Sequence, residues 1–108
     1  MKKGEIWYVD LSDGKGHEQK GERPAIVLGG ANDIVVVVPL TTNTMRATFS
    51  FTILIEASME TGLREDSIAL VFQITSLDKQ RLVKKWGRLG KEQIDAVDAL
   101  VKDLLNVG

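Results

Sequence analysis

The sequence predicts a small, mainly β protein that ends in one α-helix. Three observations carry this prediction. Five short segments rich in strand-forming residues come before residue 75. From Lys91 onward the apolar residues instead recur at spacings of three and four, which is typical of a helix packed on a core. The connections between the predicted strands are too short for parallel crossovers, so we expect a mostly antiparallel sheet curled around its core with the helix outside.

The first three predicted strands are separated by turn-forming residues. Glu5 to Leu11 alternates between two faces, one with Ile6 and the other with Val9. The next strand starts at Pro24, because a strand tolerates proline best at its first position, and it ends in a glycine pair. The β-branched run from Ile34 to Leu40 is too short for a helix and predicts a strand buried on both faces.

Two further strands and the helix complete the prediction. Phe49 to Ile55 alternates cleanly, and Ser67 to Ile74 is again short and apolar. Gly90 is a plausible cap before the helix. The apolar positions of the helix share one face: Ile94, Val97, Leu100, Val101, Leu104 and Leu105. Loops are expected at residues 12–23, 41–48 and 56–66 and in the basic stretch before the helix.

Length and composition favour one domain over residues 1–108, because 108 residues with 44% apolar content supply one core. The absence of cysteine excludes disulfides, thiolate catalysis and cysteine-based zinc sites, and it fits a reducing cytoplasm. The start has no apolar run of signal-peptide length, since Glu5 and Asp10 interrupt it. The run from Ile34 to Leu40 is far shorter than the roughly 20 residues that span a bilayer. We therefore expect a soluble, cytoplasmic protein with no membrane contact.

The net charge of -1 gives no overall preference for nucleic acid, so any such site must be local. One basic stretch is free of acidic residues and contains Lys79, Arg81, Lys84, Lys85, Arg88 and Lys91. It is interpreted either as solubilising charge beside the helix or as a surface that faces phosphates.

The loop segment GHEQKGERP, Gly16 to Pro24, holds the only histidine of the chain, His17. Its imidazole has an ordinary pKa near neutrality, so it is a candidate for proton transfer. The alternative is a solvated hairpin loop in which Gly14, Gly16 and Gly21 supply the turn conformations.

Three blocks in order carry a resemblance to a known family. They are KKGEIWYVDLSDGKGHEQKGERPAIVL, VVVVPLTT and DSIALVFQITSLDKQRL. The sequence resembles the MazF/PemK (Kid) family, the ribonuclease toxins of bacterial type II toxin-antitoxin modules. The resemblance covers nearly the whole chain from Gly4. It implies a small SH3-like antiparallel β-barrel with a C-terminal helix, in agreement with the prediction from the residues themselves.

The resemblance also implies a catalytic pair, Arg23 and Thr41. The pair Glu18 and Gln19 matches the family, and His17 matches its PemK-like branch. That branch has an arginine and an aspartate where this chain has Leu70 and Phe72, so its mechanism does not transfer whole. From that strand only Gln73 is carried over.

The chemistry implied is RNA cleavage without metal or cofactor, in which the neighbouring 2'-hydroxyl is the nucleophile. Arg23 suits the charge on the phosphorane, because its planar fork matches phosphate oxygens. Thr41 can donate a hydrogen bond to a phosphate oxygen. His17 and Glu18 are competing candidates for the general base. The expected RNA-binding residues are Gln19, Lys20, Thr42, Asn43 and Gln73.

Each of these residues also has a structural alternative. Thr41 and Thr42 would form a hydroxyl-capped turn, Gln73 a buried amide, and Glu18 a partner for Arg23. A non-catalytic relative on the same barrel, such as a CcdB-like toxin that binds a topoisomerase, is the alternative function. The resemblance further implies single-stranded RNA as substrate, a homodimer, and a separate antitoxin protein with a disordered acidic tail.

Overall fold

The structure is a computed structural model of the chain, and it describes residues 1–12 and 21–106. Its strands are β1 (Glu5–Asp10), β2 (Glu22–Ala31), β3 (Ile34–Thr41), β4 (Thr52–Ile55), β5 (Ser67–Leu70), β6 (Thr75–Asp78) and β7 (Leu82–Arg88). The helix α1 covers Lys91–Leu105, and the short 3₁₀ helices are η1 (Thr44–Thr48), η2 (Val71–Gln73) and η3 (Lys79–Arg81).

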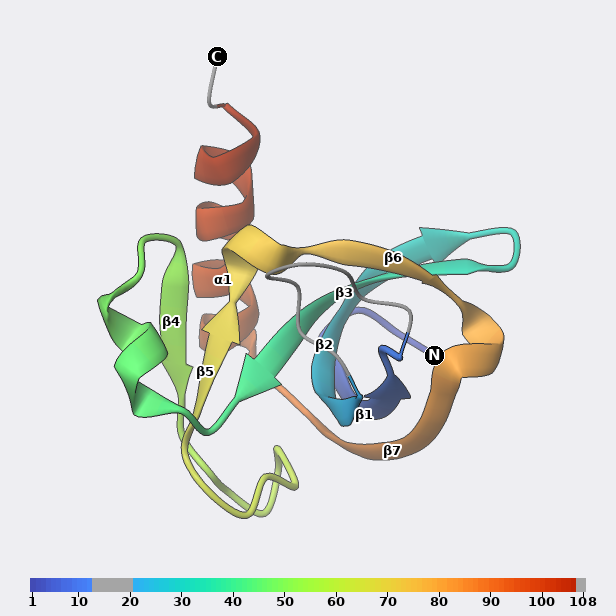
Figure 1. Ribbon diagram of the computed structural model, residues 1–108, viewed down its shortest axis with the longest axis horizontal. Coiled ribbons are helices and arrows are strands. Elements are labelled where there is room, and N and C mark those ends of the chain that lie inside the picture. Colours follow the sequence, from blue (N-terminus) through green and yellow to red (C-terminus); the bar gives the residue numbers. More distant parts are fainter. Residues whose placement is uncertain (13–20, 107–108) are drawn as a thin grey trace.

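All strand pairs are antiparallel, as predicted. The strands β7, β1, β2, β3 and β6 lie side by side in that order and curl into a barrel-like sheet (Figure 1). The sheet is not closed, because among the described strands β6 pairs with β3 and β7 pairs with β1, not with each other. The far end of β3 leaves this sheet and pairs with β5, which in turn pairs with β4.

Two clusters of buried side chains lie on opposite faces of the central strands. From β1, Ile6 enters one cluster and Val9 the other, which confirms the two apolar faces predicted for this strand. From β3, Val35 and Val37 enter one cluster, and Val38 enters the other. The prediction that this strand is buried on both faces is therefore confirmed.

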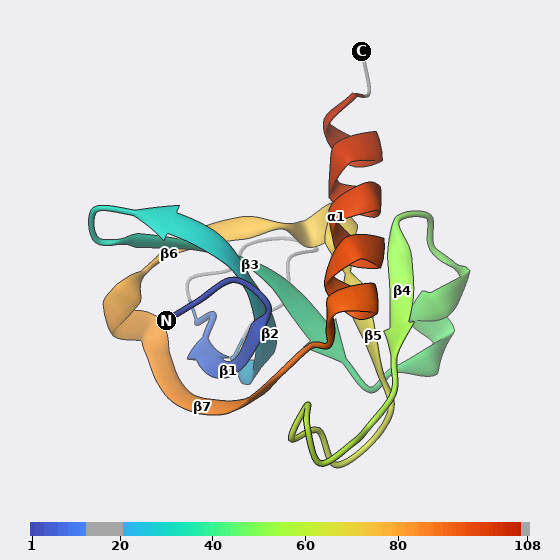
Figure 2. The same ribbon diagram turned by 180° about the vertical axis from the view of Figure 1, so that it is seen from behind.

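The helix packs over the end of the sheet, and its last turns extend beyond the other elements (Figures 1 and 2). Gly90 begins it: the Gly90 N–H donates to Gln93 Oε1 at 3.0 Å, and the Gly90 carbonyl accepts from Ile94 N. Val97 is buried, and Ile94, Leu100, Val101 and Leu104 pack against the core. The predicted stripe is wrong only at Leu105, the last residue of the helix, which is 71% exposed.

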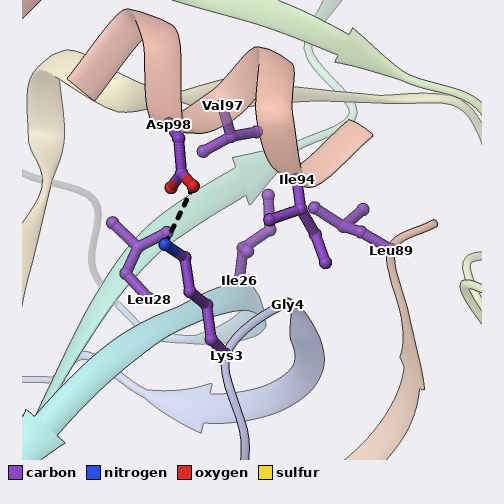
Figure 3. A pocket seen from close by; sticks show the side chains of 8 residues that line it. All are labelled: Lys3, Gly4, Ile26, Leu28, Leu89, Ile94, Val97 and Asp98. Carbon is purple, nitrogen blue, oxygen red and sulfur yellow. Dashed lines mark ion pairs between the residues drawn. The ribbon is translucent and has the colours of Figure 1, made fainter. Parts of the chain in front are cut away.

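The first turns of the helix meet β2 at a narrow seam lined by Gly4, Ile26, Ile94 and other residues (Figure 3). Lys3 Nζ and Asp98 Oδ2 form an ion pair 2.8 Å apart at its edge. The space inside is too narrow for water. Gly4 has φ of +90°, and a Cβ there would lie 2.5 Å from Ile94 Cδ1, so the seam requires glycine for both reasons.

Several predicted boundaries are wrong. The strand predicted from Phe49 begins only at Thr52, because Phe51 has φ of 59° and cannot continue an extended chain. The strand predicted to Ile74 ends at Leu70, where the chain turns into η2. The loop predicted over residues 12–23 ends earlier, since β2 begins at Glu22.

The strands β6 and β7 were not predicted. The basic stretch, predicted as a loop, contains all of β7. Most of β7 is exposed or half-buried, so its sequence has no apolar alternation to reveal it, and it is a strand because it pairs with β1.

Candidate active site

Arg23, the second residue of β2, lies between the two strands next to it. On one side it pairs with Val9 of β1. On the other side the register of β2 with β3 begins at Ala25, which pairs with Pro39. Arg23 Nη1 donates to the carbonyl oxygen of Leu40 at 3.4 Å. The fold therefore brings the Arg23 guanidinium to the end of β3, at the residue before Thr41.

The surroundings of Arg23 lower its pKa from the ordinary value. Partial burial is the first cause, because it disfavours the charged form. The nearby Tyr8 acts in the opposite direction, and the positive charge of Arg46 lowers the pKa further. An arginine in such a place keeps its charge at neutral pH but gives up solvation, and it is thereby prepared to pair with a phosphate.

Thr41 ends β3 and opens a tight turn. Its Oγ1 accepts from the Asn43 N–H at 3.2 Å, and Asn43 Oδ1 accepts in turn from the Met45 N–H at 3.1 Å as the cap of η1. The hydroxyl-capped turn is thus present. Accepting this bond occupies a lone pair of Thr41 Oγ1 and leaves its hydrogen available to donate. The Asn43 amide nitrogen likewise stays available when its oxygen caps the helix.

Gln73 lies closer to the middle of β3 than the expected pair Arg23 and Thr41. It is half-buried at the end of η2, which connects β5 to β6. The strand β5 pairs with β3 at Leu40 and Thr41, and β6 starts opposite Val37. It therefore sits beside the middle of β3. Thr42 is exposed next to the pair. His17, Glu18, Gln19 and Lys20 lie outside the described residues.

Several cations of the basic stretch form ion pairs within the chain. Lys85 Nζ lies 2.9 Å from Glu5 Oε2, and Lys91 Nζ lies 3.6 Å from Asp95 Oδ2. Lys84 and Lys85 point to opposite faces because neighbouring residues of a strand alternate. Part of this charge therefore serves local ion pairs, and a single phosphate-facing surface over the whole stretch stays a prediction.

Two residues near Arg23 were not predicted as part of the site. Tyr8 affects the Arg23 pKa and stacks on Trp86, with ring centroids 5.1 Å apart and planes at 7°. Arg46 lies in η1, inside a segment treated only as a loop. The sequence carried no signal for Tyr8. A second arginine so soon after Thr41 was a signal for Arg46 that could have been used.

Within residues 1–12 and 21–106, no group of three or more histidine or acidic side chains is placed to hold a metal ion. In the same part of the chain, no helix combines the length and the apolar character needed to cross a membrane.

With this geometry in place, comparison with known proteins identifies the family. Residues 2–105 match the model of the PemK-like, MazF-like toxins of type II toxin-antitoxin systems. The chain belongs to this family. Two relatives are enzymes by name: the endoribonuclease MazF9 of Mycobacterium tuberculosis is 32% identical over 94% of this chain and 93% of its own length, and the endoribonuclease EndoA of Bacillus subtilis is 35% identical over 91% and 88%.

Solved structures of MazF proteins share the fold. MazF of Deinococcus radiodurans has a TM-score of 0.82 at 22% identity and covers 99% of this chain and 97% of its own. A mycobacterial endoribonuclease solved in complex with its cognate antitoxin has a TM-score of 0.75 at 19% identity, over 100% and 97%. The prediction of the MazF/PemK barrel with a C-terminal helix is confirmed, with the sheet left open.

Proposed function

We propose that this chain is a toxin that cleaves single-stranded RNA at specific sequences without a metal ion, with Arg23 and Thr41 at the catalytic centre. The observation that carries the proposal is the hydrogen bond from Arg23 Nη1 to the Leu40 carbonyl, which brings the arginine to the end of β3 where Thr41 lies. The relatives named endoribonucleases cover more than nine tenths of the chain, and they support this chemistry over a CcdB-like, topoisomerase-binding function.

In the proposed reaction the 2'-oxygen attacks the neighbouring phosphorus, and the bond from phosphorus to the 5'-oxygen breaks. The 2'-hydroxyl gives its proton to a base, either His17 or Glu18, and the leaving 5'-oxygen takes up a proton. The products are a 2',3'-cyclic phosphate and a 5'-hydroxyl. Arg23 stabilises the charge that builds up on the phosphate oxygens, and Thr41 donates a hydrogen bond to one of them.

The other candidates bind the RNA in this proposal. Thr42 and Asn43 lie directly beyond Thr41, where they would meet the strand that leaves the cut. Gln73 would meet a base or phosphate beside the middle of β3. Gln19 and Lys20 belong to the loop before Arg23. RNA with unpaired bases suits such a surface, because its base edges are open to side chains.

The proposed partners are a second copy of the chain and an antitoxin in the cytoplasm. The structural relative in complex with its cognate antitoxin supports the second partner. A disordered acidic tail would suit the cations Arg23, Arg46 and Lys20.

The experiment that tests the function is cleavage of a single-stranded RNA by the purified protein with and without EDTA. Equal cleavage under both conditions, with a 2',3'-cyclic end and a 5'-hydroxyl, is expected. Loss of activity on chelation, or cleavage of an all-DNA strand that has no 2'-hydroxyl, would contradict the proposed reaction.

A further inference from the structure

A small aromatic pocket opens beside the proposed catalytic centre. Phe49, Ser50, Phe51 and Phe72 line a hollow of about 300 Å³. Phe49 is 47% exposed, and its ring centroid lies 5.8 Å from that of Phe72, with the planes at 42°. Three phenylalanines thus face one hollow, and the most exposed of them is not needed to fill the core.

The backbone of the pocket is held in an unusual conformation. Phe51 has φ of 59°, a region that bulky side chains rarely adopt. Its carbonyl oxygen accepts from the Phe72 N–H at 3.3 Å, which ties the two walls of the pocket together. Strain of this kind persists only where the surrounding structure fixes it, and it gathers at functional sites.

A cation lies against the pocket. The Arg46 guanidinium lies over the Phe49 ring, 5.2 Å from its centroid. Arg46 is also one of the charges that affect the Arg23 pKa, so it is near enough to the proposed catalytic arginine for their charges to interact. The chain makes the same connection, since η1 runs from the turn after Thr41 to Phe49, and Phe72 comes directly before Gln73.

We propose that this pocket receives one unpaired nucleobase of the RNA, close to the phosphate that is cut, and so sets the sequence preference at that nucleotide. Aromatic rings set at an angle offer a stacking face to a flat base, and a neighbouring guanidinium can reach the adjoining phosphate. The volume is at the small end of the range of ligand pockets, roughly 300–1,000 Å³, which fits a single ring system better than a peptide segment. This inference rests on the proposed function.

The experiment compares the wild-type protein with Phe49→Leu and Phe72→Leu, each of which keeps an apolar side chain but removes the ring. Phe49→Tyr and Phe72→Tyr keep the ring. Val83→Ala is the control on β7, because Val83 is 54% exposed and lies outside the pocket. Cleavage positions are mapped on a long transcript of mixed sequence. Binding is then measured with an oligoribonucleotide of the preferred site that carries a 2'-deoxy sugar at the cut.

The leucine variants are expected to lose the preference at one fixed nucleotide next to the cut, and to bind the oligonucleotide at least about 5-fold more weakly, the lower end for one base–aromatic stack. The tyrosine variants and Val83→Ala should behave like wild type. Unchanged preference and affinity in both leucine variants would overturn the pocket. If the leucine variants keep the sequence preference but differ from wild type in the mass measured by light scattering, the pocket is a contact between protein chains. That result would also overturn the pocket inference.

The two proposals fail separately. If the wild-type protein cleaves no RNA, the endoribonuclease proposal fails at the first step, and the pocket inference fails with it. If it cleaves RNA and the leucine variants keep the same preference, only the pocket inference fails.

Discussion

The Arg23 guanidinium donates to the carbonyl oxygen of Leu40, the residue before Thr41. Replacing either side chain removes a proposed donor to the phosphate and leaves the residues of the two buried clusters unchanged, since neither residue belongs to them. Their contribution can therefore be measured in a folded protein.

We expect Arg23→Ala and Thr41→Ala to fold normally and to lose most RNA cleavage. Removal of a fixed donor to a developing charge costs on the order of 3 kcal/mol in the barrier, or about a hundredfold in rate. Thr41→Ser should keep most activity, because it keeps the hydroxyl. Arg64→Ala, which removes an exposed arginine from a loop, serves as the control. Single-turnover cleavage rates decide, and near wild-type cleavage by Arg23→Ala would contradict the assignment.

His17→Ala is expected to give a smaller defect that depends on pH, because a base with a pKa near neutrality shapes the pH profile of the rate. Rates over a range of pH distinguish the two candidates for the base. If both the rate and the profile stay the same in His17→Ala, Glu18 is the better candidate.

Glu5 is a buried carboxylate held by three donors. Its Oε1 accepts from Lys2 N at 2.9 Å and from Trp7 Nε1 at 3.0 Å, and Lys85 Nζ lies 2.9 Å from Oε2. Burial alone would raise the Glu5 pKa, but the bonds from Trp7, Lys2 and Lys85 outweigh it and lower the pKa from 4.5 to about 2.

Because the folded-state pKa of Glu5 is depressed, its carboxylate stabilises the protein above pH 4.5, and this contribution is lost as the pH falls toward 2. We expect Glu5→Gln to lower the free energy of unfolding at pH 7 by on the order of 3 kcal/mol and to flatten its dependence on pH in that window. Urea unfolding at several pH values measures both. Glu56→Gln, at an exposed carboxylate, should stay within about 0.5 kcal/mol of wild type, and an equal loss in both variants would refute the role of Glu5.

At the scale of elements, the sequence predicted the strands and the helix whose apolar pattern reflects their burial. The first three strands and the helix were found because their apolar residues, such as Ile6, Val37 and Val97, form patterns typical of their element. The strand β7 was missed, because an exposed edge strand rich in lysine has the composition of a loop and is fixed only by its pairing with β1.

The candidate site was predictable only where its residues stand in local sequence motifs. Arg23 and Thr41 stand in local motifs that a resemblance can identify. Tyr8, Arg46 and the Phe49–Phe72 contact arise from segments far apart in sequence, and only the folded chain brings them together.

Gly4 allows the approach of the helix to the sheet. We expect Gly4→Ala to lower the free energy of unfolding by about 1–3 kcal/mol, because alanine is strained at positive φ and its Cβ would overlap the Ile94 side chain. Gly29→Ala is the matched control on β2, since its Cβ would meet nothing within 4 Å. Urea unfolding compares the two. Equal stabilities would show that the seam relaxes freely.

At the scale of the whole molecule, the edge strands β7 and β4 differ. The edge strand β7 carries Lys84 and Lys85, which discourage pairing with another chain. The edge strand β4 is uncharged and leaves Leu54 52% exposed. The apolar run from Ile34 to Leu40 is largely covered by this chain's own strands. The proposed homodimer would therefore use β4.

Light scattering at micromolar concentration is expected to give twice the chain mass of 11.9 kDa. Leu54→Lys should shift the protein toward the monomer, whereas Val83→Lys, at a similarly exposed position of β7, should not. A wild-type monomer that cuts RNA at full rate would rule out a dimer as a requirement.

The proposed antitoxin should bind more weakly as salt rises and should compete with RNA, because its acidic tail would cover the same cations. Co-expression with the neighbouring reading frame, pull-down and a cleavage assay at several salt concentrations measure this. A neighbour that binds and leaves cleavage intact would reject the blocking model.

The pairing of β1 with both β2 and β7 also sets the point during synthesis at which the sheet can be completed. The chain emerges from the ribosome N-terminus first, so β1 acquires its second neighbour, β7, only after Arg88 has been synthesised. The helix follows later still. A nascent toxin therefore lacks its finished sheet for as long as most of its own message is being translated. We therefore expect any RNA cleavage that needs the finished sheet to begin only after β7 has left the ribosome.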